Sequence, residues 1–173
     1  RVYAFNIITE NAINSYYEKV PSGWAITNLE TVIDYEQPTE YLVNSTDYKN
    51  EYPTPVLTAG KSLILGYTNE TNGIFTDTPV IIFDDFTTEC KYVDFPFKVK
   101  STAMKILHPN KSAILSKYAY YLMKTIQVDH ENHQRYWIST FSKEHILLPP
   151  LSEQQRIIEC IELYFGLLDG IAN

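Results

Sequence analysis

Alternating apolar and polar positions divide most of the chain into short strands. Runs rich in Val, Ile, Leu and Phe, with turn residues between them, predict half-buried β-structure. The predicted strands occupy residues 56–58, 62–67, 79–83, 92–99, 102–107, 137–141 and 146–148. A polar cluster ending in Asn72-Gly73 predicts a turn between the second and third of these strands.

Helical spacing appears at three places, one before the run of strands, one inside it and one after it. Residues 27–30 have the spacing of a capping box and predict a short helix to about Tyr35. A second helix with a broad apolar face is predicted to begin at Ser112 or Ser116. Residues 36–55 are polar and rich in proline, which indicates a long surface loop. Without a regular βαβ alternation, we expect an α+β fold, with a mixed, mostly antiparallel sheet and flanking helices.

The third predicted helix is the longest and ends the chain. Ser152 can cap it, with Gln155 reaching back and Glu153 in the first turn. Positions spaced alternately three and four apart form a seven-residue repeat with one polar interruption. These positions are Leu151, Gln154, Ile158, Ile161, Phe165, Leu168 and Ala172. The spacing leaves two alternatives open, a coiled-coil seam that pairs with another helix or a face that lies on its own domain.

Two motifs, one near each end, frame the chain. The first is Leu-Leu-Pro-Pro-Leu-Ser-Glu-Gln-Gln-Arg-Ile-Ile at residues 147–158, followed by a helix closing on Leu-Leu-Asp-Gly-Ile. The second is Tyr-Tyr-Glu-Lys-Val-Pro-Ser-Gly-Trp at residues 16–24. Together they resemble the conserved region and the start of a target recognition domain in the specificity (S) subunit of type I restriction-modification systems. The resemblance covers residues 16–173.

The resemblance implies a division of the chain and a set of partners. We expect a linker or N-terminal extension at 1–15, a target recognition domain at 16–150 and the start of a conserved spacer helix at 151–173. In the family, two such domains each read one part of a split DNA sequence, and separate subunits methylate and cleave. The implied chain is therefore non-catalytic, needs no cofactor, and binds double-stranded DNA, methyltransferase (M) subunits and, indirectly, the restriction (R) subunit.

The start and the end of the chain bear on its assembly. Only one recognition domain and a truncated helix are present, and the first residue is Arg1 rather than Met. We expect an excised second domain, or else a half subunit that dimerises through its helix. In either case the subunit or helix interface is expected to comprise Gln154, Ile158, Ile161, Phe165 and Leu168.

Charge is distributed unevenly along the sequence. The net charge of −7 argues against a nucleic-acid partner when taken as one number. Residues 1–90 carry −9, residues 91–143 carry +6 with nine basic side chains, and residues 144–173 carry −4. Local potential rather than net charge steers phosphate binding, so the middle stretch can give an acidic protein a basic face. The alternative is that these lysines form an ordinary solvated surface.

Recognition residues are inferred from type and placement. Three predicted loop regions, 66–73, 86–101 and 130–137, carry side chains of the kinds that contact phosphates and base edges. The candidates for DNA contact are Asn69, Thr71, Asn72, Lys91, Lys98, Lys100, Ser101, Gln134, Arg135 and Tyr136. The resemblance implies that the regions 66–73 and 86–101, together with the segment 130–137, face one short half of a bipartite site.

Catalytic alternatives have weaker signals. An amino-methyltransferase needs a polar residue before Pro-Pro and an aromatic after it, but here leucines stand on both sides, and no glycine-rich cofactor loop is present. A metal-dependent endonuclease would need converging carboxylates and a lysine. The available set is Asp77, Asp84, Glu89 and Lys91. Asp84-Asp85 also fits a simple turn between two strands, which is the favoured interpretation.

The histidines and cysteines do not indicate a metal site. His130 and His133 form the only close histidine pair, and a third ligand is not evident. Cys90 and Cys160 are far apart, which favours idle thiols in a reducing compartment. Neither a signal peptide nor a window as long as a membrane span is apparent. We therefore expect a cytoplasmic location and no membrane partner.

Overall fold

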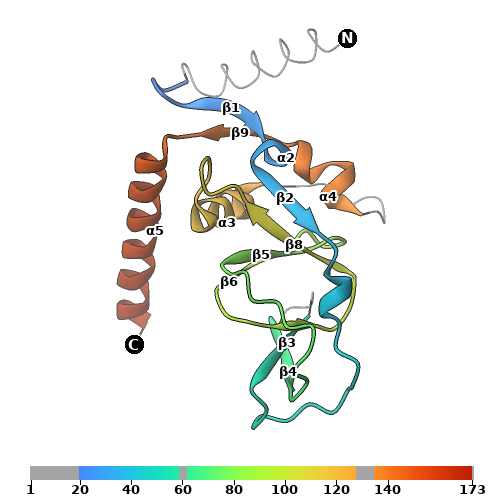
Figure 1. Cartoon of the computed structure of the whole chain (residues 1–173). Helices are drawn as coiled ribbons and strands as arrows, with labels where there is room; N and C mark the ends of the chain where they lie inside the picture. Colours follow the sequence, from blue (N-terminus) through green and yellow to red (C-terminus); the bar gives the residue numbers. More distant parts are fainter. Residues whose placement is uncertain (1–19, 59–61, 128–134, 173) are drawn as a thin grey trace.

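A two-stranded ribbon joins distant parts of the sequence at one end of the molecule. The computed structural model describes residues 20–58, 62–127 and 135–172. Strand β1 (Ala25–Asn28) pairs antiparallel with β9 (His145–Leu148), so the start and the end of the described domain close on each other. Figure 1 shows this ribbon, a four-stranded sheet and a three-stranded sheet following one another along the molecule.

The four-stranded sheet forms the centre of the fold. Its order is β2 (Ile33–Glu36), β8 (Met104–Pro109), β5 (Val80–Asp84) and β6 (Cys90–Val93), and all neighbouring pairs are antiparallel. Side chains of β5 alternate between two apolar clusters, with Ile81 and Phe83 in one and Val80 and Ile82 in the other. Because β5 is buried on both faces, its sequence is an unbroken apolar run rather than an alternating one.

Each apolar cluster belongs to a different layer. Helix α3 (Ser116–Thr125) packs on one face of the four-stranded sheet through residues such as Tyr118 and Met123. The other face contributes to a second cluster with the three-stranded sheet. That sheet has the order β4 (Ile64–Thr68), β3 (Thr54–Leu57) and β7 (Lys98–Val99), with β3 antiparallel to β4 and parallel to β7. The expected α+β class with a mostly antiparallel sheet and a C-terminal helix is confirmed.

Two local predictions were wrong because tertiary pairing overrides local signals. The helix expected to reach Tyr35 is only α2 (Leu29–Val32), since the next four residues pair with β8 as strand β2. The strand expected at 137–141 is instead α4 (Tyr136–Ser139) followed by the 3₁₀ turn η2 (Phe141–Lys143). Trp137 and Phe141 stack at 6.1 Å between ring centroids in the core, a pair four residues apart that suits a helical turn.

The polar stretch between β2 and β3 contains one short helical turn and is attached to a strand that is distant in sequence. It contains the 3₁₀ turn η1 (Pro38–Tyr41) and otherwise runs as a loop to β3, as expected. Val43 N–H donates to Val99 O at 2.9 Å, which attaches this loop to the end of β7. The loop therefore lies against the three-stranded sheet instead of extending freely into solvent.

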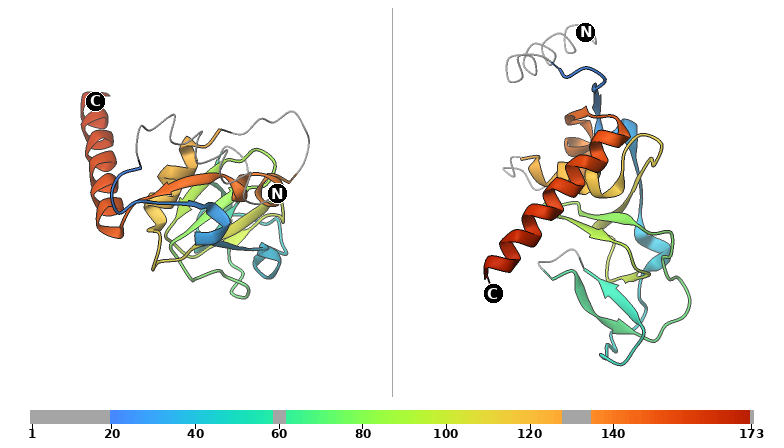
Figure 2. Two further views of the ribbon diagram at one scale, coloured as in Figure 1. Left: turned by 90° about the horizontal axis from the view of Figure 1, so that it is seen from above. Right: turned by 90° about the vertical axis from the view of Figure 1, so that its left-hand side faces the viewer.

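The C-terminal helix α5 (Leu151–Ala172) begins at Leu151, one residue before the predicted cap Ser152. Its first turn is closed by Glu153 and Gln154 N–H groups that donate to Pro150 O, so Ser152 lies inside the helix and does not cap it. Gln155 does not complete a capping box but donates to Glu159. Figure 2 shows that α5 contacts the domain near its start and that its C-terminal end stands clear of the sheets. In the parts of the chain that the structure covers, none of the helices has the combined length and apolarity needed to cross a bilayer.

Candidate nucleic-acid interface

Three segments that are distant in sequence meet along one edge of the molecule. Lys100 N–H donates to Leu57 O at 2.9 Å, and Asp85 N–H donates to Ala103 O at 3.1 Å. Tyr136 N–H in turn donates to Asp85 O at 2.8 Å. The connection between β7 and β8, the turn after β5 and the start of α4 are therefore neighbours.

We name this region the Lys100–Arg135 edge and define it by Tyr48, Phe86, Lys100, Ser101 and Arg135. Its two cations each lie over an aromatic ring. Lys100 Nζ is 5.9 Å from the centroid of the Tyr48 ring, and the Arg135 guanidinium is 5.6 Å from that of Phe86. An exposed cation beside an aromatic face is a combination that binds nucleic-acid backbone and stacks on unpaired or accessible bases.

Arg135 is oriented by a buried carboxylate. Asp85 is fully buried, accepts a hydrogen bond from Trp137 N–H at 3.0 Å, and lies 3.3 Å from Arg135 Nη1. Lys105 Nζ is also fully buried, 3.2 Å from Asp85 in an ion pair and 4.7 Å from the centroid of the Tyr35 ring. The Arg135 side chain remains 50% exposed, so several of its five N–H donors can still face a phosphate.

The predicted loop at 69–73 lies at the other end of the three-stranded sheet. Thr68 pairs with Thr54 at the start of β3, whereas Lys100 follows the end of β7 beside Leu57. Four residues of strand separate the two ends by about 10 Å. Asn69, Thr71 and Asn72 are exposed there. The structure thus brings Lys100, Ser101 and Arg135 together but separates them from the 69–73 turn.

Several sequence-based candidates are not on the surface. Lys98 is only 2% exposed and donates to Asn72 O at 2.6 Å, so it is removed from the set of phosphate contacts. Tyr136 is also 2% exposed, because the helical turn of α4 directs its ring into the core. Gln134, His130 and His133 lie outside the described residues.

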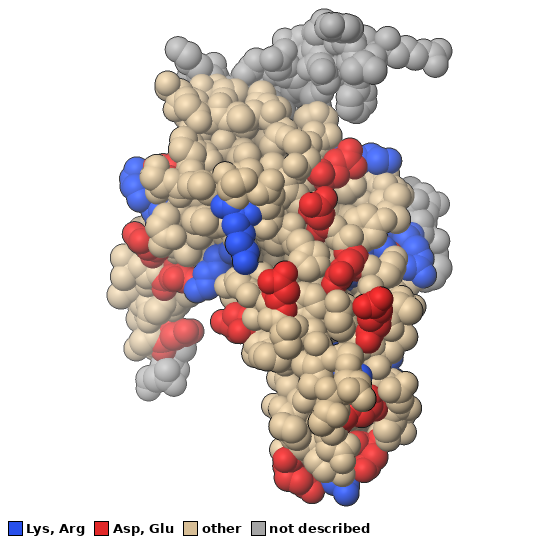
Figure 3. All heavy atoms as spheres, in the orientation of Figure 1, with Lys and Arg blue, Asp and Glu red and all other residues tan. Residues whose placement is uncertain are grey.

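The middle basic stretch does not form a continuous basic face. Five of its nine cations are committed to carboxylates, because Lys98, Lys105, Lys117, Lys124 and Arg135 all form ion pairs. Figure 3 shows that, on the face drawn, basic side chains lie in separate groups among acidic ones. Lys100 and Arg135, which is half-exposed despite its ion pair, each lie beside an aromatic ring and are thus more informative than the net charge of the stretch.

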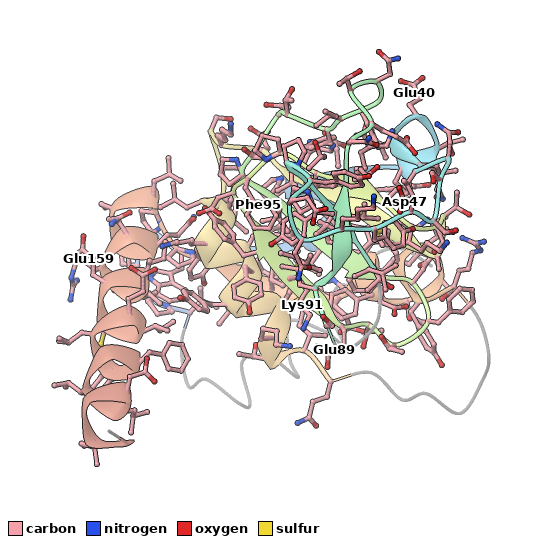
Figure 4. All side chains as sticks on the ribbon, turned by 90° about the horizontal axis from the view of Figure 1, so that it is seen from below. Glu40, Asp47, Glu89, Lys91, Phe95 and Glu159 are labelled. Atoms are coloured by element: carbon pink, nitrogen blue, oxygen red, sulfur yellow. The ribbon has the colours of Figure 1, made fainter. Side chains whose placement is uncertain are left out.

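The nuclease set does not converge. Asp84 accepts hydrogen bonds from Phe86 N–H at 2.9 Å and Thr87 N–H at 3.2 Å, which closes the turn as the simpler interpretation predicted. Glu89 instead pairs with Lys124 at 2.9 Å, and this ammonium lowers the pKa of Glu89. Figure 4 shows Glu89 and Lys91 together, away from Glu40 and Asp47. Within the described ranges, no three His, Cys, Asp or Glu side chains are arranged to hold a metal ion.

The two cysteines are in contrasting places. Cys90 is buried in β6, and burial raises the pKa of its thiol to about 11, so its thiolate is scarce at neutral pH. Cys160 is exposed on α5. Neither is in a disulfide.

The first half of the predicted seam on α5 is used within the chain. Gln154 is fully buried: its Oε1 accepts from Leu115 N–H at 2.8 Å, and its Nε2 donates to Ala113 O and Pro149 O, each at 2.9 Å. The N-cap residue of α3 is Leu115 rather than Ser112 or Ser116, and Gln154 satisfies the backbone N–H of this residue. Ile158 is 5% exposed and belongs to the same apolar cluster as α3. Gln154 and Ile158 are therefore removed from the expected interface with another helix.

The second half of α5 is largely uncovered. Lys117 of α3 pairs with Glu162, and the Tyr121 and Phe165 rings lie 6.2 Å apart. Beyond this contact the apolar side chains face solvent, with Phe165 54%, Leu168 60% and Ile171 82% exposed. Of the predicted seam, Ile161, Phe165 and Leu168 thus remain available.

Sequence reasoning missed three residues of interest. Tyr48 and Phe86 have no distinguishing periodicity, and only the approach of Lys100 and Arg135 gives them significance. Glu70 was missed because its partners, Asn44, Ser45 and Lys98, are about 25 residues away in sequence. The Asn72-Gly73 pair predicted a turn near Glu70, but a turn signal does not indicate that the Glu70 carboxylate bonds to a distant loop.

Known proteins share both the sequence and the architecture. A family model described as the Type I restriction modification DNA specificity domain matches residues 21–171. The chain is 44% identical over 167 residues to the type I restriction enzyme EcoR124I/EcoR124II specificity subunit of Escherichia coli. That match covers 88% of this chain and 41% of the relative.

Solved structures of low sequence identity have the same fold. The HsdS subunit from Thermoanaerobacter tengcongensis has a TM-score of 0.59 at 14% identity, covering 95% of this chain and 44% of that one. The type I restriction-modification S subunit from M. genitalium has a TM-score of 0.63 at 15% identity, with 89% and 42% covered. A chain from work on assembly and conformational transition of the type I R-M system has a TM-score of 0.68 at 14% identity, with 96% and 45% covered.

All of these relatives are more than twice as long as the region that this chain matches. The family and the relative are both named for specificity, in agreement with the expected non-catalytic chain. The matched region includes the ribbon, both sheets and nearly all of α5. This chain therefore belongs to the family of type I restriction-modification DNA specificity domains.

Proposed function

We propose that the chain reads one half of a bipartite double-stranded DNA target and directs methyltransferase subunits, and through them the restriction subunit, to that site. The observation that carries the proposal is the presence of two different surfaces on one domain. The Lys100–Arg135 edge offers exposed cations beside aromatic rings, and the distal part of α5 offers an exposed apolar strip. In this proposal residues 16–150 recognise DNA and residues 151–173 begin the spacer helix.

The start of α5 is fixed on the domain, which supports a role for this helix in placing a bound partner at a defined position relative to the DNA. Gln154 bonds to the segment before α3 and to Pro149, and Lys117 pairs with Glu162 further along the helix. The helix therefore has a defined direction relative to the DNA-contacting edge. A partner that grips the exposed strip would be held at a defined place on the DNA. The second half of the target would be read by another recognition domain or by a second copy of the chain.

The DNA part of the proposal is tested by salt dependence. We expect the chain to bind duplex DNA with an affinity that falls steeply as salt rises, because phosphate contacts release counterions. Lys100→Ala and Arg135→Ala should each reduce the slope of log affinity against log salt by about 1. Lys111→Ala, an exposed lysine outside the edge, is the matched control and should leave the slope unchanged. An affinity of the unaltered chain that is indifferent to salt would contradict the proposal.

A second candidate function, a protein-interaction module that uses only the helix, is favoured by the exposed strip alone. Phe165→Asp combined with Leu168→Asp separates it from the first, since these side chains are more than half exposed and contribute little to folding. If the chain acts through both surfaces, the double variant retains DNA binding and loses association with a methyltransferase subunit or a second copy. If the chain acts through the helix alone, Lys100→Ala and Arg135→Ala change neither DNA affinity nor its salt dependence.

A further inference from the structure

A buried ion pair holds two exposed loops together at the end of the three-stranded sheet opposite the Lys100–Arg135 edge. Glu70 Oε1 accepts hydrogen bonds from the backbone N–H groups of Asn44 and Ser45, each at 2.9 Å. Its Oε2 accepts from Asn44 Nδ2 at 3.2 Å and lies 3.1 Å from Lys98 Nζ. Lys98 donates at 2.6 Å to Asn72 O on the other side of the turn.

The surrounding backbone leaves little space for rearrangement. Gly73 has a φ of +61°, and a Cβ atom there would lie 2.5 Å from Glu40 O and 3.3 Å from Lys98 Nζ. Only glycine therefore fits where the turn passes over the lysine and beside the 38–41 turn. The segment at 44–45 and the turn at 69–73 thus form one fixed unit. We name the Glu70–Lys98 pair the latch, and we call the exposed surface of these two segments the latched surface.

The chemistry of the latched surface differs from that of the Lys100–Arg135 edge. Glu70 is the only ionisable residue within residues 42–46 and 69–73, and the Lys98 ammonium balances the charge of its carboxylate in an ion pair. The side chains that face outward are amides and hydroxyls, with Asn69, Thr71 and Asn72 all exposed. These two ranges are bordered by the exposed Glu40 and by the exposed Asp47–Lys49 pair, so the surface has no excess of cations to attract phosphates. Asparagine can instead pair with adenine, and threonine can contact a base edge or a thymine methyl group.

A buried ion pair is a poor way to increase stability, because the cost of desolvation offsets much of the attraction. An apolar pair of similar volume between the same loops would fold as well. The charged pair also fixes the orientation of the loops. The Glu70 carboxylate accepts from the N–H groups of Asn44 and Ser45, and the Lys98 ammonium donates to Asn72 O. The geometry therefore fits a role in orienting the exposed amides.

We infer that Glu70 and Lys98 are positioning residues for base recognition: they fix a neutral amide and hydroxyl surface that selects the target sequence, while the Lys100–Arg135 edge holds DNA without regard to sequence. This inference rests on the proposed function. It assigns specificity to the latched surface and retention to the cationic edge.

The test uses the full chain and a pool of DNA duplexes that carry a block of randomised base pairs, with sequencing of the bound fraction. The test variant is Glu70→Ala/Lys98→Met, which removes both charges together and leaves no buried ion unpaired. The control is Asp47→Ala/Lys49→Ala, which removes an exposed ion pair from the same loop. We expect the test variant to lose at least about tenfold in enrichment of the preferred sequence, the value of one good side-chain contact to a base. Its salt slope should not change.

The outcomes separate the inference from the proposed function. If the unaltered chain enriches no sequence, the proposed function fails and the inference fails with it. If the unaltered chain enriches a motif and the test variant enriches the same motif equally well, the inference alone is overturned. Equal losses in the control and the test variant also overturn it.

A second variant guards against misfolding of the first. Asn69→Ala/Asn72→Ala truncates exposed side chains and leaves the Glu70–Lys98 pair untouched. We expect a similar loss of sequence preference with an unchanged thermal midpoint and salt slope. A preference that survives this variant overturns the inference whether or not the first variant folds.

Discussion

Two carboxylate–lysine pairs, one beside the four-stranded sheet and one beside the three-stranded sheet, have different consequences for the surface above them. In the four-stranded sheet Asp85 and Lys105 are both fully buried, and Asp85 also holds the half-exposed Arg135. In the three-stranded sheet Lys98 is 2% exposed and Glu70 18%, and the pair holds neutral loops. The first pair positions a cation and the second positions amides, so similar buried chemistry supports two kinds of contact with a ligand.

The difference in burial also predicts a difference in stability. Glu70 is partly exposed and Asp85 is fully buried, so truncation of Glu70 opens a path for water to the Lys98 ammonium, whereas truncation of Asp85 leaves the Lys105 ammonium dry. The Asp85–Lys105 pair lies at the end of the β5–β8 ladder, whereas Glu70 itself bonds to the backbone of the loop at 44–45. The comparison can therefore be tested by removing each carboxylate in turn.

Asp85→Ala is expected to have the largest effect. It leaves the Lys105 ammonium buried without a counter-ion and the Trp137 N–H without an acceptor, at a cost of about 3–5 kcal/mol in the free energy of unfolding. Glu70→Ala should cost about 1–3 kcal/mol, because solvent replaces part of what is lost. Urea unfolding of the two variants provides the measurement. Equal losses would show that burial does not distinguish the two pairs.

Replacement of the whole inner pair should have an intermediate effect. Asp85→Leu/Lys105→Met removes both charges, so most of the stability lost in Asp85→Ala should return, to within about 1–2 kcal/mol of the unaltered chain. Arg135 would nevertheless lose its orienting carboxylate, and DNA retention should stay weak. Urea unfolding and a filter-binding assay measure the two quantities. Recovery of both together would mean that Asp85 does not position Arg135.

The smallest expected effect is on the pH dependence of stability. Burial alone would raise the pKa of Glu70, but hydrogen bonds from the Ser45 N–H, Lys98 and the Asn44 N–H outweigh it and hold the pKa below its ordinary value. A depressed pKa in the folded chain adds stability above the unfolded pKa of about 4.3, and this stability is lost as the pH falls through the folded value.

Glu70→Gln should therefore be less stable than the unaltered chain at pH 6, by less than about 1 kcal/mol, and the difference should shrink as the pH falls toward 3. Thermal unfolding across this pH range provides the measurement. Glu40→Gln, an exposed glutamate beside the same loops, is the control and should give a constant offset. If the stability difference between Glu70→Gln and the unaltered chain grows on acidification, the pKa of Glu70 is not lowered in the folded chain.

Much of the architecture follows from sequence signals that are local. The apolar run at 79–83 predicts β5 because a buried central strand needs apolar side chains on both faces, and the mainly apolar run at 102–107 predicts β8 although it contains Lys105. The helix after Pro150 follows from its aliphatic spacing. The motifs near the two ends also indicated the family, which the family model and the relative confirm. These features are properties of neighbouring residues and can be seen without knowledge of the fold.

Tertiary structure decided what the individual polar residues do. Gln154 occupies a seam position by spacing, yet it is buried and bonds to the N–H of Leu115 at the start of α3, since α5 packs on that helix. Lys98 lies on β7 and Lys100 follows two residues later, just after the strand, but Lys98 is enclosed and Lys100 is exposed. The reason is physical: burial, ion pairing and hydrogen bonding depend on segments brought together from distant parts of the chain, and a pattern of neighbouring residues does not specify these contacts.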